Sequence, residues 1–293
     1  MLFNNKNLLI TLLSLCTFQT YAAQCTADSF AKNKLNNFIL LNQQTRTEIP
    51  KSVAVTIDSP DGYLRTSVQS NFSQCGELLG GHMKEVKTSA NPKTVFTATS
   101  EIQLNKTDVG WLVQLDSNGI ITDKNSHKTT QTYRQTLEGR YQLNDKGIIS
   151  HIVNRSTIAA TRPEDKDEIA TSTIKYTLNS SGLLVSATSK GSMALDNNTV
   201  VYSYDDNNRL IKIQSPSTIE EYTYDNEGRE LSLSKTQTYF TIEKKLITCE
   251  KWNSHGECTR ASIDIMITPM DRTGKQYVDK HHAVMTAKYE YWN

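Results

Sequence analysis

The sequence lacks a surplus of charge of either sign, and that absence excludes two classes of partner. Its 293 residues include 32 Lys and Arg against 31 Asp and Glu. Removing the first 22 residues removes Lys6 and no acid, so the remainder holds 31 of each sign and has no formal net charge. Nucleic-acid binding and polybasic attachment to membranes both need a basic surplus, so neither is expected.

Long hydrophobic runs are missing as well, apart from one at the N-terminus. The apolar stretch 8–18 follows Lys6 and precedes Thr20-Tyr21-Ala22, which places small residues at the −3 and −1 positions of a secretory cleavage site. The sequence therefore predicts a signal peptide over residues 1–22 and an exported domain over 23–293. The run is too short to span a membrane comfortably, so no transmembrane segment is expected after cleavage; an uncleaved anchor is the alternative.

A lipid anchor is not expected, because a lipoprotein signal needs a small residue directly before its cysteine. Leu15 precedes Cys16, and Gln24 precedes Cys25. With 37% hydrophobic residues and a mean hydropathy of -0.51, the chain is also too polar for a helical membrane protein. We expect a soluble protein in a Gram-negative periplasm or outside the cell.

Recognised catalytic motifs are absent too. The chain contains no Gly-x-Ser-x-Gly, no Gly-rich phosphate loop and no His-Glu-x-x-His. His281 and His282 are adjacent, and adjacent strand residues point to opposite faces, so they cannot chelate one ion together. The adjacent acids Glu220 and Glu221 are expected to be solvated for the same reason. We expect no enzymatic activity and no cofactor.

Two oxygen-rich segments raise the question of calcium. Asp205–Asn208 and Asp225–Glu227 offer carboxylates and amides, but neither has the full ligand spacing of a calcium loop. Asp and Asn are also common in tight turns, where their side chains accept backbone N–H bonds. Turn chemistry therefore accounts for both segments, and no bound metal is expected.

Four cysteines remain once the signal peptide is removed: Cys25, Cys75, Cys249 and Cys258. An even number in an oxidising compartment predicts two disulfides, with three possible connectivities. We favour Cys25–Cys75 and Cys249–Cys258, because the second pair flanks one turn. The alternative is a zinc site made by that pair with His255, although its spacing does not match the usual short knuckle.

The sequence does contain a repeated turn. Tyr202-Ser-Tyr204-Asp205 and Tyr222-Thr-Tyr224-Asp225 each lead into a polar turn and a returning apolar segment. Gly, or Asn in its place, accepts the positive φ that a tight hairpin needs. Turns of this kind are expected around Gly62, Gly119, Gly147, Gly182, Asn208, Gly228 and Gly256, with a degenerate one near Gly80-Gly81.

This pattern predicts an all-β fold: repeated antiparallel β-hairpins that form an extended, curved sheet or a sandwich. Residues 25–44 are expected to hold one short N-terminal helix or a first strand, and residues 287–292 alternate like a closing strand. The charge run 162–168 is expected to be a solvated loop, and a seam between two halves would fall near 162–170. An outer-membrane barrel is also conceivable, but its strands would be less polar.

The tyrosine pairs define the candidate binding face. Tyr202 and Tyr204 share one strand face, as do Tyr222 and Tyr224. An exposed aromatic strip could bind glycan or peptide, whereas packing across strands would make the same residues part of the core. Core packing is the favoured interpretation.

The Tyr-x-Tyr-Asp-x-x-Gly-Arg units resemble the YD repeats of Rhs-type proteins. Over more of the chain, the sequence resembles the YnfC family of enterobacterial envelope lipoproteins, which implies an envelope location and no established activity. The matching segments are Pro60-Asp-Gly62 with Ser73-Gln-Cys75, Tyr202–Asp206, Cys249–Cys258 and Tyr289–Trp292. The chain departs from the family in lacking a lipobox.

These features favour a non-enzymatic binding or scaffold protein of the cell envelope, with an envelope protein or a glycan as its partner. The repeat architecture motivates this hypothesis, because it offers an extended face and no assembled active site. An envelope glycan hydrolase is one alternative. An interbacterial effector or immunity component is another, suggested by the Rhs-like repeats.

Overall fold

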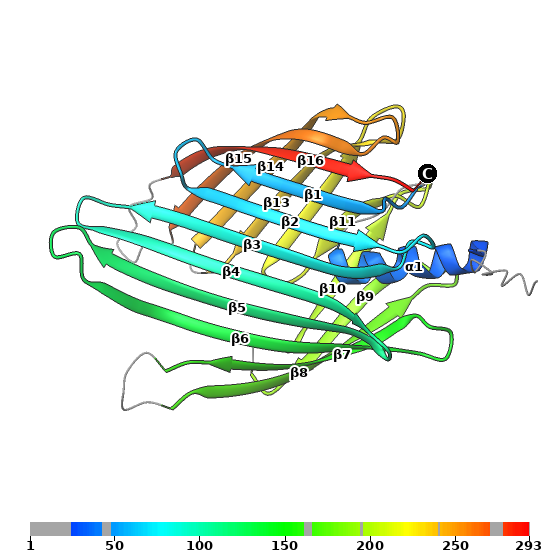
Figure 1. Ribbon diagram of the computed structural model, residues 1–293, viewed down its shortest axis with the longest axis horizontal. Helices are drawn as coiled ribbons and strands as arrows, with labels where there is room; N and C mark the ends of the chain where they lie inside the picture. Colours follow the sequence, from blue (N-terminus) through cyan, green and yellow to red (C-terminus); the bar gives the residue numbers. More distant parts are fainter. Residues whose placement is uncertain are drawn as a thin grey trace, which may run out of the picture.

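Antiparallel strands close into a barrel in the computed structural model (Figure 1). The structure describes residues 25–42, 48–160, 166–193, 196–239, 241–269 and 278–292, so the predicted signal peptide lies outside the described residues. Within these ranges the chain forms one helix and sixteen strands. They are α1 (Ala27–Leu41), β1 (Ser52–Asp58), β2 (Leu64–Phe72), β3 (Leu78–Ala90), β4 (Thr94–Thr107), β5 (Gly110–Asp123), β6 (Thr129–Leu143), β7 (Ile149–Ile158), β8 (Glu168–Leu178), β9 (Leu184–Gly191), β10 (Asn198–Tyr204), β11 (Leu210–Gln214), β12 (Thr218–Tyr224), β13 (Glu230–Thr238), β14 (Thr241–Trp252), β15 (Cys258–Pro269) and β16 (Asp279–Glu290).

The all-β prediction is confirmed, but the extended sheet or sandwich is wrong because the sheet closes on itself. Each strand pairs with its neighbour in sequence, and β1 then pairs with β16 from Ser52↔Glu290 to Asp58↔Val284. Closure removes the two free edges that an open sheet would expose. The predicted seam falls between β7 and β8, which pair with each other; residues 161–165 of that segment lie outside the described ones.

The predicted turn recurs at one end of the barrel. At five of these turns the first residue, an Asn or Asp, accepts backbone N–H bonds from residues two and four positions later. The residue three positions after it has φ between 60° and 79°. The five turns begin at Asn144, Asn179, Asp205, Asp225 and Asn253. They confirm a polar turn that is built by the side chain of its first residue.

Two predicted turns are wrong, and both lie inside strands. Gly80-Gly81 is part of β3, and Gly119 lies in β5. A Cβ on Gly119 would come 2.3 Å from Cε1 of Tyr133, so this glycine makes room for a neighbouring ring. Glycine within a strand commonly marks such a close approach, and here it imitates a turn signal.

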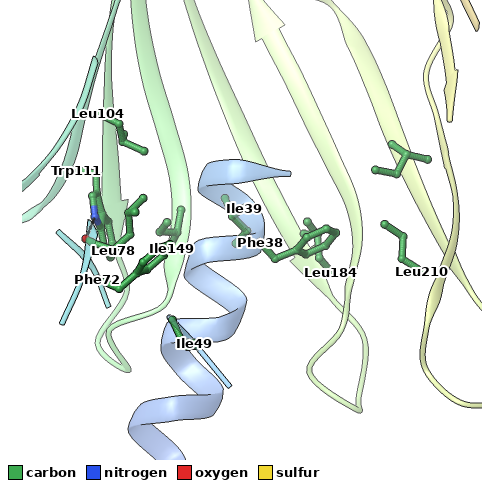
Figure 2. Close-up of a cluster of buried hydrophobic side chains, with 11 residues drawn as sticks. Phe38, Ile39, Ile49, Phe72, Leu78, Leu104, Trp111, Ile149, Leu184 and Leu210 are labelled. Carbon is green, nitrogen blue, oxygen red and sulfur yellow. Dashed lines mark hydrogen bonds between the residues drawn. The ribbon is translucent and has the colours of Figure 1, made fainter. Parts of the chain in front are cut away.

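The inner face of the barrel is identified by the side chains that surround α1. Leu104, Trp111, Ile149 and Leu184 belong to one buried cluster with Phe38 of the helix (Figure 2). Residues two apart on a strand share a face, and residues paired in register share it too. From these anchors the inner face can be followed along every strand.

The outer face is polar. Charged side chains occupy the middle of its strands, and some pair there, as Arg134 does with Asp116 at 3.2 Å. Exposed apolar residues on this face have charged neighbours: Met266, for example, has Asp264 on its own strand and Lys244 and Lys280 as partners across strands. Charged residues of the outer face include Lys84, Glu101, Asp116, Arg134, Arg155, Lys175, Lys212, Glu221, Lys244 and Asp264.

Helix α1 closes the turn end of the barrel from within (Figures 1 and 2). Thr26 caps its first turn by accepting from the Ser29 backbone N–H, and Asn42 ends it in a left-handed conformation. Phe38 and Ile39 are buried among the inner-face side chains. The short N-terminal helix expected within residues 25–44 is therefore confirmed over Ala27–Leu41.

Asparagine side chains fix α1 to the barrel. Asn37 donates to the Gly76 carbonyl at 2.8 Å and accepts from the Leu78 N–H at 3.2 Å. Asn36 makes the same pair of bonds to Gly147 and Ile149, at 3.0 and 2.9 Å. Each amide thus completes the backbone hydrogen bonding where a strand leaves its turn.

Both disulfides favoured by the sequence are present, so the zinc alternative is wrong. Cys25 is bonded to Cys75, which ties the start of α1 to the turn between β2 and β3. Cys249 is bonded to Cys258 across the turn between β14 and β15. Each bond restricts the unfolded chain, by about 3 kcal/mol for the short loop and roughly 4 for the long one in the chain-entropy model.

Candidate ligand-binding lumen

The lumen has a wall formed by the inner faces of β4 to β8, on which apolar side chains are interspersed with polar ones such as Ser100, Ser117, Gln135 and Ser156. The row of inward-facing residues that includes Leu104 on β4 and Trp111 on β5 continues along these strands toward the end of the barrel opposite the five turns. Its residues keep accessible surface, although they face inward. They include Phe96, Ile102, Leu115, Leu137 and Ile174. A barrel of eight strands is filled by its own side chains, whereas sixteen strands leave internal space. The half-buried wall shows that such space is present here.

The opposite side of the barrel is filled. Ile263 and Ile265 of β15 are 2% and 1% exposed, and they pack with Tyr63, Leu64 and Ala283. These residues come from β15, β16 and the β1–β2 end, so this part of the interior is an ordinary core. The accessible lumen therefore lies against β4 to β8, away from this second core.

A layer of four tyrosines lies between α1 and the lumen. Tyr141, Tyr176, Tyr202 and Tyr222 each stand three residues before the Asn or Asp that opens a turn, on alternate strands β6, β8, β10 and β12. Tyr202 makes an edge contact with Phe38 of α1 at 5.7 Å. Burial raises the pKa of Tyr141 and of Tyr202 to about 12, and raises the pKa of Tyr176 and Tyr222. All four are neutral hydroxyl donors at physiological pH.

A belt of six charged residues lies on the inner face: Glu85 and Lys87 of β3, Glu220 of β12, Lys235 of β13, and Glu243 and Lys245 of β14. We call it the charged belt. Its ion pairs are Lys235–Glu220 at 2.8 Å, Lys245–Glu243 at 2.8 Å, Lys87–Glu243 at 3.2 Å and Lys87–Glu85 at 3.7 Å. Because β3 and β14 are not neighbours in the barrel, the Lys87–Glu243 pair crosses the interior and separates the filled core from the lumen.

Glu220 joins the belt to α1. Its carboxylate accepts from the Tyr222 hydroxyl at 3.0 Å and from the Asn42 side-chain amide at 3.4 Å, in addition to its contact with Lys235. The expectation that Glu220 is solvated is therefore wrong, since its side chain is 8% exposed. Glu221 lies on the outer face, 59% exposed, as the alternation predicts.

Acid should weaken the crossing pair. Burial alone would raise the pKa of Glu243, but the nearby ammonium groups of Lys245 and Lys87 outweigh it, and the pKa lies below its ordinary value of 4.5. A carboxylate with a depressed pKa stabilises the fold above its ordinary pKa, and that contribution disappears as pH falls through the folded pKa. We therefore expect that the urea concentration at the midpoint of wild-type unfolding decreases as the pH is lowered below about 4.5.

Glu243→Gln removes this titration, so the variant should be less stable at pH 7 and should lose less stability between pH 5 and pH 3. Glu138→Gln, on the outer face, is the matched control and should follow the wild type. Parallel curves for wild type and Glu243→Gln would contradict the assigned role. Urea unfolding followed by circular dichroism across this pH range makes the measurement.

The structure brings the predicted tyrosines together, but on the inside. Tyr202, Tyr204, Tyr222 and Tyr224 all face the lumen and pack against the cluster around α1. Core packing, the favoured interpretation, matches this position, and an exposed outer strip does not. The Tyr204 hydroxyl on β10 donates to the Leu184 carbonyl on β9. The Tyr224 hydroxyl on β12 donates in the same way to the Leu210 carbonyl on β11.

His281 and His282 lie on opposite faces, as their adjacency predicts. His281 faces inward, stacks on Tyr63 at 3.7 Å and contacts Asp61 at 2.7 Å. His282 faces outward beside Asp264. His255 stacks on Tyr291 and contacts Glu48 near the turn between β14 and β15. Among the described residues, no group of three or more His, Cys, Asp or Glu could hold a metal ion.

Sequence reasoning missed two of the four tyrosines in the layer beside α1, and it missed the charged belt. Tyr141 and Tyr176 precede Asn144 and Asn179 at the same distance at which Tyr202 precedes Asp205. That spacing was a usable signal. The belt had none, because Lys235 and Lys245 come from separate strands whose register is known only from the fold.

Comparisons with known proteins show no family for this chain. No protein-family model matches it, and no curated protein matches it. Among solved structures, a porin-like protein from Bacteroides uniformis is similar at a TM-score of 0.43 and 13% identity, over 84% of this chain and 99% of that one. The beta domain of the Bordetella autotransporter Brka reaches a TM-score of 0.20 at 5% identity, over 83% and 100%. TM-scores this low support no conclusion about function.

No helix among the described residues is long and apolar enough to cross a membrane.

Proposed function

We propose that the protein is a non-enzymatic binding protein of the cell envelope that holds an elongated apolar ligand in its lumen. One observation carries this proposal: the inner wall of the barrel exposes apolar side chains, among them Phe96, Ile102 and Leu115, to the lumen, while the outer wall is charged. Binding sites for small molecules are typically concave and apolar, with a few polar groups that orient the ligand. The inner wall with its tyrosine layer and charged belt has that composition.

The outer wall supports an aqueous setting. A barrel that spans a membrane presents an apolar band to lipid, and each Lys or Arg at the middle of that band costs about 2–4 kcal/mol. Arg134, Arg155 and Lys84 lie on mid-strand positions of the outer face. Water therefore suits this surface better than lipid, which agrees with the predicted export to the periplasm.

The apolar wall makes the test straightforward. Ile102→Trp places a large ring in the lumen, and Gln103→Trp places the same ring on the outer face of the same strand. Losing about 60 Å² of ligand contact corresponds to roughly 1.5 kcal/mol, or about tenfold in affinity. We expect Ile102→Trp to weaken binding of the neutral fluorescent probe N-phenyl-1-naphthylamine by about that factor, while Gln103→Trp changes it less than twofold.

Circular dichroism and thermal unfolding establish that both variants keep the fold. Equal probe affinity in the two variants would argue against a lumen site. Failure of the wild type to bind the probe at all would refute the proposal.

A further inference from the structure

The charged belt exposes one lysine more than its paired acid, at the Lys235–Glu220 contact between β13 and β12. The Lys235 side chain is 36% exposed and that of Glu220 8%, whereas Lys245 and its partner Glu243 are 18% and 16% exposed. At this pair, a ligand in the lumen therefore meets the ammonium group of Lys235 before the carboxylate of Glu220.

Lys235 and Lys245 are direct partners in the register of β13 and β14, and both point inward. Like charges directly opposite each other on neighbouring strands are unfavourable. Their carboxylate partners lie on the flanks: Glu220 is on β12, and Glu243 is two residues along β14. The position between the two ammonium groups is thus where an added anion would relieve repulsion most.

The surroundings suit an amphiphile. The apolar wall of Phe96, Ile102 and Leu115 forms one side of the lumen, and the belt lies across it on β12 to β14 and β3. Lysine carries three N–H donors, and an ion pair with one carboxylate oxygen takes one of them. The remaining capacity can serve a carboxylate or a phosphate.

We infer that the lumen ligand is an amphiphile with an anionic headgroup, and that the headgroup binds between Lys235 and Lys245. This inference rests on the proposed function, because it places a headgroup in the same lumen that takes the apolar chain. It adds the class of ligand and the residues that select it. The carboxylate of a fatty acid and the phosphate of a phosphorylated lipid share this chemistry.

Four dodecyl compounds distinguish the possibilities by competition against the neutral probe: dodecanoate, dodecyl phosphate, dodecanol and dodecyltrimethylammonium. A charge-assisted contact contributes enough for a preference of about 10- to 100-fold. We expect dodecanoate or dodecyl phosphate to bind more tightly than dodecanol by that factor and the cation to bind most weakly. Whichever anion binds more tightly identifies the source of the headgroup.

Lys245→Gln should abolish the preference for the anion and leave dodecanol binding unchanged. Lys244→Gln is the matched control, because Lys244 is the adjacent residue on the outer face of β14. Lys235→Arg keeps the charge beside Glu220 and should retain the preference. If Lys245→Gln does not fold, the comparison of headgroups on the wild type decides alone.

Equal affinity for dodecanol and both anions, with the probe still bound, would overturn the headgroup inference and leave the proposed function standing. Absence of binding by the probe and by every dodecyl compound would overturn both.

Discussion

Asn37→Ala should release α1 from the barrel and lower the free energy of unfolding by roughly 2–6 kcal/mol. Asn37 is fully buried, and its amide satisfies the Gly76 carbonyl and the Leu78 N–H. Without it, two backbone groups beneath the helix lose their partners, and each buried unsatisfied group costs about 1–3 kcal/mol. The helix can relieve that cost by leaving the lumen while Cys25–Cys75 still tethers it.

The matched control is Asn71→Ala, the same substitution on the outer face of β2, where the residue is exposed. We expect it to change stability by less than about 0.5 kcal/mol. Hydrogen exchange of the α1 amides measures the release directly: they should exchange faster in Asn37→Ala and at the wild-type rate in Asn71→Ala. Unchanged protection of α1 in Asn37→Ala would show that its amide does not hold the helix.

Trp111→Ala should cost about 3–5 kcal/mol, the usual effect of removing a fully buried aromatic side chain. Trp111 is 1% exposed and belongs to the cluster around α1, and its indole N–H donates to the Leu78 carbonyl at 2.8 Å. The Lys106 ammonium also lies 4.0 Å from the ring centroid. The substitution therefore removes packing, a buried hydrogen bond and a cation–π contact together.

Trp292→Ala provides the comparison, because Trp292 is 42% exposed near the end of the chain and contacts Lys51. It should cost less than about 1 kcal/mol. Equilibrium unfolding in urea compares the two variants. A loss below 1 kcal/mol in Trp111→Ala would mean that the cluster around α1 does not stabilise the barrel.

The hairpins could be predicted from sequence because their determinants are local. Asn144, Asn179 and Asp225 form their turns with their own side chains and a residue of positive φ three positions later. The disulfide across the turn at Asn253 follows from the same local logic. Gly119 shows the limit of this method. The sequence around it looks like a turn, but the glycine is needed because a Cβ there would collide with the ring of Tyr133.

Closure of the barrel could not be predicted in this way. It depends on the pairing of Ser52 with Glu290, which are at opposite ends of the domain. Strand alternation separates two faces but does not say which face is inside when both carry charges. Lys235, Lys245 and Glu220 on the inner face made the alternation less clear, and the tyrosines that sequence analysis selected turned out to line the same lumen.

Native mass spectrometry of the protein, released from cells by osmotic shock without detergent, tests the central claim most directly. The claim is that water surrounds the outer wall and that an amphiphile occupies the lumen. We expect a soluble barrel carrying one non-covalent adduct of lipid mass in the wild type and in Gln103→Trp, and little or none in Ile102→Trp. A protein that leaves the cell envelope only in detergent, or an adduct equally abundant in all three, would contradict the account.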